Sequence, residues 1–197
     1  MDLAVALGWL TAITHISGFA IYTQSMLKGK TVLYTATWAS WAFISTTNAI
    51  TYLVMTHDVV KSAAPISSTS ACLIVFLIAL SQRRATKLDP KDKLVVAIGL
   101  LSLAVWLVFK NAASANLILQ PAIAISFIPT YRGVWAKPET ENALPWFIWT
   151  FAYVISITVV LMRWDNWLSL VYLAMCLILH GGVGIIASTR RHLPDQR

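Results

Sequence analysis

The sequence predicts an all-α integral membrane protein with seven transmembrane helices, and three observations lead to this prediction. The mean hydropathy is +0.70, and only 12% of the residues are charged, about half the fraction typical of a soluble domain. The apolar residues fall into seven runs, each close to the roughly 20 residues that a membrane crossing needs. The alternating pattern of β-barrel strands is absent, so helices remain as the spanning elements.

The seven predicted helices follow one another with polar connections between them. The third opens with Pro65 and a run of serine and threonine, and the fourth is short and nearly uniform in composition. Pro121 and Pro129 lie in the fifth run, where two outcomes are open: they kink the helix and free carbonyl groups for a cavity, or they are inert. The predicted helices cover residues 3–24, 35–55, 62–81, 93–109, 113–131, 145–162 and 167–188.

The connections predict the orientation in the membrane. Of the 15 Lys and Arg residues, only Lys61, Lys110 and Arg163 fall on one side of the predicted bilayer. The positive-inside rule makes the other, basic side cytoplasmic. We therefore expect a multi-pass protein of the cell membrane with its N-terminus outside and its C-terminus in the cytoplasm. The predicted cytoplasmic side carries Lys28, Lys30, Arg83, Arg84, Lys87, Lys91, Lys93, Arg132, Lys137, Arg190, Arg191 and Arg197.

An internal repeat relates the two halves of the chain. The second predicted helix contains Trp38, Trp41 and Phe43, and the sixth contains the same residue types at positions 146, 149 and 151. A constant offset of 108 residues superposes predicted helices one to three on predicted helices five to seven. Because the fourth helix restores the starting side, the repeats are predicted to be parallel, with a site between them. The predicted units are a first repeat (1–84), a linker helix (85–110), a second repeat (111–192) and a cytoplasmic tail (193–197).

The chain resembles the SWEET and PQ-loop superfamily of membrane transporters. That family has a proline, often followed by glutamine, near the cytoplasmic end of the first helix of each triplet. Gln24 stands near this position in the first repeat and Pro129 in the second, and Pro145 matches a proline that begins the second helix of a triplet in the sugar transporters. The tryptophan spacing is also similar to that of transporters for the vitamin precursor nicotinamide riboside. The resemblance implies a fold of two parallel three-helix bundles.

Polar side chains near the predicted bilayer centre are the candidate binding residues, because burying them in lipid is costly. The repeat offset pairs Asn48 with Ser156 and Cys72 with His180. Serine and threonine in spanning helices often bond their own backbone or join helices, which is the alternative for each of them. The candidate substrate-binding residues are His15, Trp41, Asn48, Cys72, Gln120, Trp149, Tyr153, Ser156 and His180.

Several other activities are disfavoured. The net charge of +7 comes in short bursts between apolar runs, so we expect no nucleic-acid partner. His15 and His180 stand without carboxylate or thiolate partners, and we expect no metal and no other cofactor. Every lysine lies in a loop or at a helix end, which excludes a retinal Schiff base. The HExxH and GxSxG motifs and intramembrane carboxylate pairs of enzymes are also absent.

The predicted function is therefore a transporter that moves a small polar, neutral metabolite, sugar-like or vitamin-precursor-like, by alternating access between two three-helix bundles. The expected partners are this small-molecule substrate and the lipid bilayer, and a homo-oligomer is possible. The alternative is a non-transporting membrane receptor or scaffold on the same fold, since a fold does not determine function. A polar central cavity favours transport, whereas a scaffold could pack Asn48, Gln120 and His180 against one another.

Overall fold

The computed structural model describes residues 2–28, 35–81 and 90–189, and in these residues all regular structure is helical. Helices α5 and α6 together correspond to the fifth predicted run; every other predicted run is one helix. The helices are α1 (Leu3–Leu27), α2 (Thr35–Thr56), α3 (Ala63–Ser81), α4 (Pro90–Phe109), α5 (Ala112–Ser126), α6 (Ile128–Ala136), α7 (Ala143–Met162) and α8 (Leu168–Thr189), with a short 3₁₀ helix, η1, at Pro138–Thr140.

Five stretches are long and apolar enough to cross a membrane: α1, α3, the combined α5 and α6, α7 and α8. Helix α2 carries threonines and Asn48 on its inner side, and these lower its hydropathy. In α4 the apolar part is Val96–Phe109, because the first turn is charged. Large apolar side chains such as Trp9, Phe151 and Ile178 are exposed, while His15, Asn48 and Asn116 are buried. Exposed apolar faces around buried polar groups are compatible with a lipid environment.

The expected kink in the fifth run lies at Phe127, between α5 and α6. Pro129 occupies the first turn of α6, where its missing N–H removes no helical hydrogen bond. The Phe127 amide donates a hydrogen bond to the Ala124 carbonyl oxygen, three residues earlier, so the turn between α5 and α6 is tighter than an α-helical turn. Pro121, in contrast, lies inside α5. The break between α5 and α6 therefore lies next to Pro129, whereas α5 continues past Pro121.

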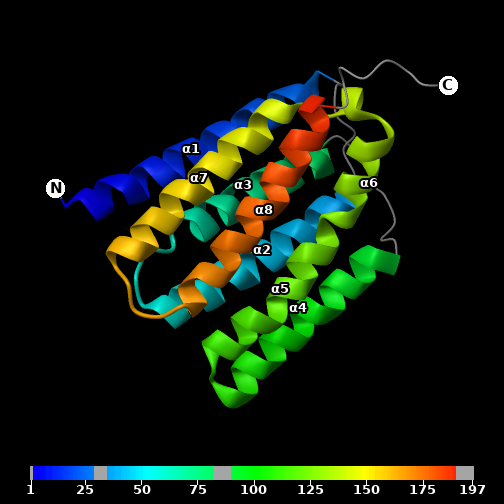
Figure 1. The fold of residues 1–197 in the computed structure, drawn as a ribbon. Coiled ribbons are helices and arrows are strands. Elements are labelled where there is room, and N and C mark those ends of the chain that lie inside the picture. Colours follow the sequence, from blue (N-terminus) through cyan, green and yellow to red (C-terminus); the bar gives the residue numbers. More distant parts are fainter. Residues whose placement is uncertain (1, 29–34, 82–89, 190–197) are drawn as a thin grey trace.

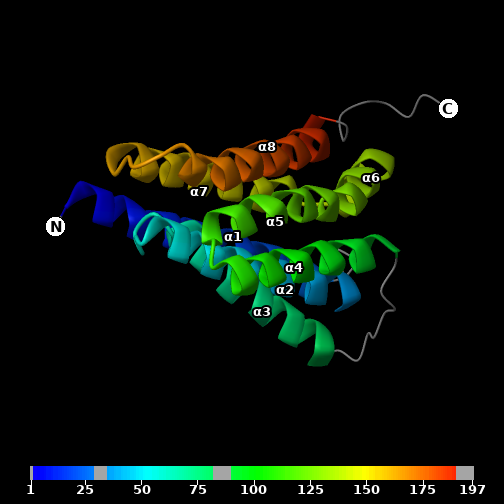
Figure 2. The same ribbon diagram turned by 90° about the horizontal axis from the view of Figure 1, so that it is seen from below.

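Helix packing follows a simple order. Helix α3 lies between α1 and α2, and α8 lies between α7 and the α5–α6 pair. The two groups meet where α1 packs against α7 and α2 packs against α5, while α4 covers α5 and α2 from outside. Figure 1 shows the helices running side by side, and Figure 2 separates α1–α4 from α5–α8.

The two ends of the bundle differ in their connections. One end holds the α2–α3, α4–α5 and α7–α8 connections, and the other holds the segment from Lys137 to Asn142 before α7. Several parts of the sequence-based orientation lie outside the described residues. These are the predicted tail (193–197) and the basic residues Lys30, Arg83, Arg84, Lys87, Arg190, Arg191 and Arg197.

Candidate ligand-binding cavity

A cavity of about 260 Å³ lies between the two groups of helices. This volume is far above the roughly 10–15 Å³ that one water molecule needs. It extends from the middle of α2 and α8 toward the end where η1 and the start of α7 lie. The lining residues are Phe19, Tyr22, Trp38, Trp41, Ile44, Ser45, Asn48, Ser68, Ile123, Ser126, Phe127, Pro129, Thr130, Gly133, Val134, Glu141, Trp146, Trp149, Tyr153, Tyr172, Cys176 and His180.

Aromatic rings form most of the wall, and the polar edges of two of them are already bonded. The indole N–H of Trp149 donates to the His15 carbonyl oxygen at 3.1 Å. The indole N–H of Trp146 donates to the Glu141 carboxylate at 3.1 Å. The Trp149 ring also packs on Phe19, with ring centroids 4.6 Å apart. These bonds hold the rings in fixed positions, so they offer apolar surface rather than hydrogen-bonding groups.

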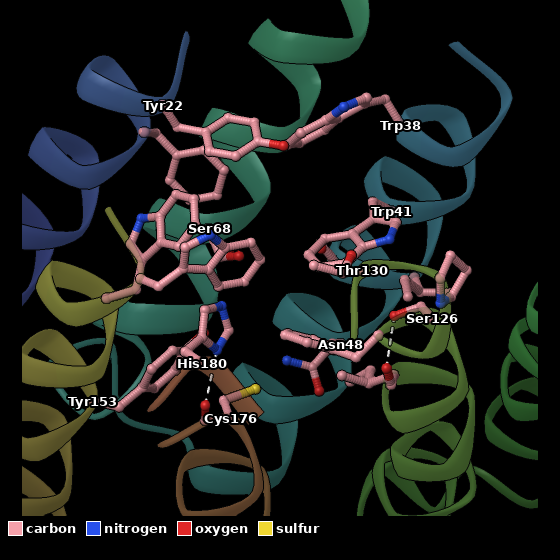
Figure 3. Close-up of a pocket in the computed structure, with 18 of the residues that line it drawn as sticks. Tyr22, Trp38, Trp41, Asn48, Ser68, Ser126, Thr130, Tyr153, Cys176 and His180 are labelled. Atoms are coloured by element: carbon pink, nitrogen blue, oxygen red, sulfur yellow. Dashed lines mark hydrogen bonds between the residues drawn. The ribbon is translucent and has the colours of Figure 1, made fainter. Parts of the chain in front are cut away.

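A buried amide network fixes the side chain of Asn48 on the α2 side of the cavity. The Asn116 amide nitrogen donates to Asn48 Oδ1 at 3.0 Å and to Thr51 Oγ1 at 3.1 Å. Gln120 in turn donates to the Asn116 side-chain oxygen at 3.0 Å. Because the Asn48 oxygen is held in this way, its amide nitrogen is directed into the cavity (Figure 3). Asn48 therefore offers a donor to a bound molecule.

His180 faces the cavity from α8 and offers an acceptor. Its Nδ1 lies 2.8 Å from the Cys176 carbonyl oxygen. A carbonyl oxygen accepts hydrogen bonds only, so Nδ1 carries the proton and Nε2 is the acceptor of the neutral ring. Figure 3 shows the ring on the opposite side of the cavity from Asn48. The cavity thus has a donor on one wall and an acceptor on the other.

A layer of tyrosines closes the cavity beyond Asn48 and His180, on the side of the α2–α3 and α7–α8 connections. The Tyr153 and Tyr172 hydroxyls lie 3.1 Å apart. Tyr52, which is completely buried, donates its hydroxyl proton to the Ser169 carbonyl oxygen at 2.6 Å. Tyr52 and Tyr172 also meet edge to face, with centroids 5.9 Å apart. This layer joins α2, α7 and α8 and separates the cavity from the connections beyond it.

Two ion pairs lie beyond the tyrosine layer and join the α2–α3 connection to the α7–α8 connection. The Lys61 ammonium lies 2.9 Å from the Asp165 carboxylate, and Arg163 Nε lies 2.6 Å from the Asp58 carboxylate. We call these four residues the latch. Each connection supplies one acid and one base, so the two contacts are reciprocal.

The latch carboxylates are ionised at neutral pH. Burial raises the pKa of Asp58, but hydrogen bonds from Arg163 and from the backbone of Lys61 and Val60 outweigh it and hold the pKa below 3.8. The pKa of Asp165 is lowered in the same way, mainly by Lys61 against the effect of burial. A depressed acid pKa contributes stability above its unfolded value and loses it as the pH falls through the folded value. The lowered pKa values therefore keep both latch carboxylates charged and paired at neutral pH.

Five of the nine predicted binding residues line the cavity: Trp41, Asn48, Trp149, Tyr153 and His180. The other four are buried beside it. His15 Nδ1 lies 3.0 Å from Ser67 Oγ, and Cys72 accepts a long hydrogen bond from Ser45. Gln120 packs on Asn116, and Ser156 is buried in α7. His15 Nε2, Gln120 Oε1 and Ser156 Oγ have no hydrogen-bond partner in the described part of the chain.

Sequence reasoning missed Asn116 and most of the aromatic lining. Asn116 lies one helical turn before Gln120, a spacing that places both on one face of α5 and that could have indicated the network. Phe19, Tyr22 and Trp146 looked like packing or interfacial residues, because aromatic side chains are common in both roles. Glu141 belongs to a loop in the sequence, and only the return of the chain through η1 places it on the cavity wall.

Asn116→Ala is expected to lower the stability of the folded protein by about 1 kcal/mol, the usual scale for hydrogen bonds between helices in a membrane. The change removes the donor to Asn48 and Thr51 and the acceptor of Gln120. Thermal unfolding in detergent measures the effect. Thr158→Ala is the matched control, since the exposed Thr158 hydroxyl only bonds its own backbone at Val154. Equal melting temperatures for the two variants would show that the network contributes nothing.

In the described residues, no cluster of three or more His, Cys, Asp or Glu side chains is placed to hold a metal ion. Comparison of the chain with family models, curated proteins and solved structures finds no match. The cavity geometry and the sequence are therefore the observations from which a function is inferred.

Proposed function

We propose that the chain is a membrane transporter for a small polar metabolite, built from two parallel three-helix units around the central cavity. In this proposal all seven helical segments span the bilayer, with α5 and α6 forming one bent span. The proposal agrees with the resemblance to the SWEET and PQ-loop superfamily. Its main support is the way the cavity lining is distributed over the two halves of the sequence.

The cavity lining is paired by the same offset that relates the two halves. Trp38 and Trp146 both line the cavity, and so do Trp41 and Trp149. In each pair the positions differ by 108 residues. The same spacing relates lining residues Phe19 and Phe127, Tyr22 and Thr130, Ser45 and Tyr153, and Ser68 and Cys176. Equivalent positions meet at one cavity when a two-fold axis passes through it, as the repeat hypothesis requires.

The helix contacts support the same symmetry. In the first half α3 packs between α1 and α2, and in the second half α8 packs between α5–α6 and α7. The contact of α1 with α7 then corresponds to the contact of α2 with α5. Alternating access would be a rocking of one unit against the other at these two contacts. Helix α4 would connect the two units without belonging to either unit.

The closed end of the cavity indicates the state of such a transporter. The tyrosine layer and the latch lie at the end that the basic residues predict to be outside. The cavity extends to the opposite end, where Tyr22, Trp38 and Glu141 lie. With the predicted orientation, the structure corresponds to a conformation closed to the outside and directed toward the cytoplasm.

The alternative is a receptor or scaffold on the same fold. A scaffold needs no void at its centre and could use Asn48, Gln120 and His180 to join its helices. Asn48 and Gln120 do meet through Asn116, but His180 lies across a cavity from them. The cavity with its opposed donor and acceptor favours the transporter.

Binding and transport can be tested in two steps. Purified protein is screened by thermal shift against sugars, amino acids, nucleosides and free heterocycles, and any ligand found is tested for counterflow in proteoliposomes. We expect Asn48→Leu to weaken binding and counterflow, whereas Thr158→Ala leaves both unchanged. A ligand that binds in the cavity without crossing the membrane would favour the receptor.

The orientation has its own test, in a background without Cys72 and Cys176. A cysteine at Trp164, in the α7–α8 connection, is expected to react with an impermeant maleimide in intact cells. A cysteine at Ala136, at the end of α6, is expected to react only after permeabilisation, because the positive-inside rule places it in the cytoplasm. Both positions are exposed. The reverse pattern would invert the proposed topology.

A further inference from the structure

We infer that the cavity binds a planar heteroaromatic molecule with one hydrogen-bond acceptor and one donor at its edges, rather than a polyol such as a sugar. This inference rests on the proposed function only in taking the cavity as the ligand site. It stands on three features of the cavity: its ring faces, the hydrogen bonds that several of its polar groups already make, and the placement of Asn48 and His180.

The ring faces suit a flat ligand. Trp41 comes from α2 and packs on Phe127, with centroids 5.0 Å apart. Trp149 comes from α7, on the other side of the cavity, and packs on Phe19. Figure 3 shows Trp41 on one wall and Tyr153, which comes from α7 like Trp149, on the opposite wall. Aromatic side chains that face a common space bind planar ring systems by stacking, and this attraction tolerates many ring types.

Several polar groups on the wall are already bonded. The Ser126 hydroxyl donates to the Ile123 carbonyl at 2.6 Å, and the Tyr153 and Tyr172 hydroxyls bond each other. The indole N–H groups of Trp146 and Trp149 are bonded as well. A sugar hydroxyl that met one of these groups would compete with the partner that the group already has, and each hydroxyl left unsatisfied lowers affinity by about 5- to 150-fold. The wall therefore disfavours a polyol.

Two polar groups at the centre of the cavity, each with its direction fixed by a hydrogen bond, define a pattern for the ligand edges. The Asn48 amide donates from one wall, and His180 Nε2 accepts from the other. Heteroaromatic rings with a ring nitrogen or carbonyl on one edge and an N–H on another complement this arrangement. The cavity volume of about 260 Å³ lies below the roughly 300–1,000 Å³ of pockets for drug-sized molecules. A molecule of one or two rings is thus the size that fits.

Equilibrium binding to the full-length protein in detergent micelles tests this inference. One set of probes contains adenine, hypoxanthine, cytosine and lumazine, and the other contains glucose, sorbitol and trehalose. We expect at least one ring compound to bind and none of the polyols to do so. Trp41→Leu should weaken ring binding about tenfold or more, as expected for a lost stacking partner. Trp9→Leu is the control, because Trp9 is exposed and lies outside the cavity.

Asn48→Leu provides a second variant in case Trp41→Leu does not fold, and it should weaken the same ring compound about fivefold or more. Binding of a polyol that is lost in Asn48→Leu would overturn the inference while leaving the transporter proposal intact. Failure of every ring compound to bind would also overturn it. Ring binding without counterflow in proteoliposomes would support the inference and contradict transport instead.

Discussion

Gly18→Ala is expected to lower the stability of the protein by about 2 kcal/mol and to displace Trp149 from the cavity wall. A Cβ atom at position 18 would lie 2.5 Å from Nε1 and 2.8 Å from Cδ1 of the Trp149 ring. That ring is buried and bonded to the His15 carbonyl, so it cannot move away freely. Overpacking of this kind costs about 1–3 kcal/mol, which exceeds the roughly 1 kcal/mol that alanine gains over glycine in a helix.

Gly181→Ala is the matched control for this prediction. Its Cβ would lie 3.5 Å from Thr150, an ordinary contact distance. The helix preference for alanine should therefore dominate, and the variant should be as stable as the parent or slightly more stable. Thermal unfolding of both variants measures the contrast. Trp149→Phe should restore part of the stability in the Gly18→Ala background, because phenylalanine lacks the indole nitrogen that meets the new methyl group. A double variant that is no more stable than Gly18→Ala would disprove the proposed clash.

The sequence was sufficient to predict the helices because hydropathy reports directly on length and burial in lipid. Each predicted run corresponds to a helical segment, and Pro129 marks the break in the fifth run correctly. The prediction from hydropathy is weaker for α2, since the polar residues that line the cavity reduce its apolar character. Function and a clear transmembrane signal oppose each other in that helix.

The cavity was harder to predict than the helices. Depth along a helix follows from residue number, and this placed Asn48, Trp149 and His180 near the centre. The direction of a side chain around the helix axis depends on which neighbours pack on it, and a nearly uniform apolar helix gives little indication of this. His15 and Ser156 have the right depth but lie in contacts between helices. Glu141 reaches the wall through the path of a loop, which hydropathy does not report.

Lys61→Met is expected to open the end of the bundle that holds the latch and to speed labelling of a buried cysteine there by about 5- to 30-fold. The Lys61 side chain is only 4% exposed and pairs with Asp165, whose side chain is 35% exposed. Removing one member of a fully buried pair costs about 3–5 kcal/mol, and solvent screening of Asp165 reduces this to about 1–2 kcal/mol. Since the pair joins the two halves, the lost energy shifts the population toward a conformation open at this end.

The position to label is Ser169, which is completely buried in α8 and whose carbonyl accepts the Tyr52 hydroxyl. Its own hydroxyl donates to the Asp165 carboxylate at 3.1 Å, so every rate is compared within one Ser169→Cys background. A cysteine at this position, in a background without the native cysteines, is protected while the latch is closed. In detergent micelles, the rate of reaction with a water-soluble thiol reagent then reports how often the latch end opens. Lys110→Met is the matched control, because it removes the same charge from an exposed lysine at the same end of the bundle.

Reversing the pair separates the ion pair from the loss of packing. Lys61→Asp combined with Asp165→Lys restores opposite charges between the same two connections and should restore most of the protection at position 169. The ratio of the Lys61→Met labelling rate to the parent rate should also stay constant from mildly acidic to mildly alkaline conditions, because the lowered pKa of Asp165 keeps its carboxylate charged there. The separate rates rise with pH, since the thiolate of the introduced cysteine is the reacting form. If the charge-swapped variant reacts as fast as Lys61→Met, the closure of this end depends on the shape of the lysine side chain and on the tyrosine layer rather than on the latch charges.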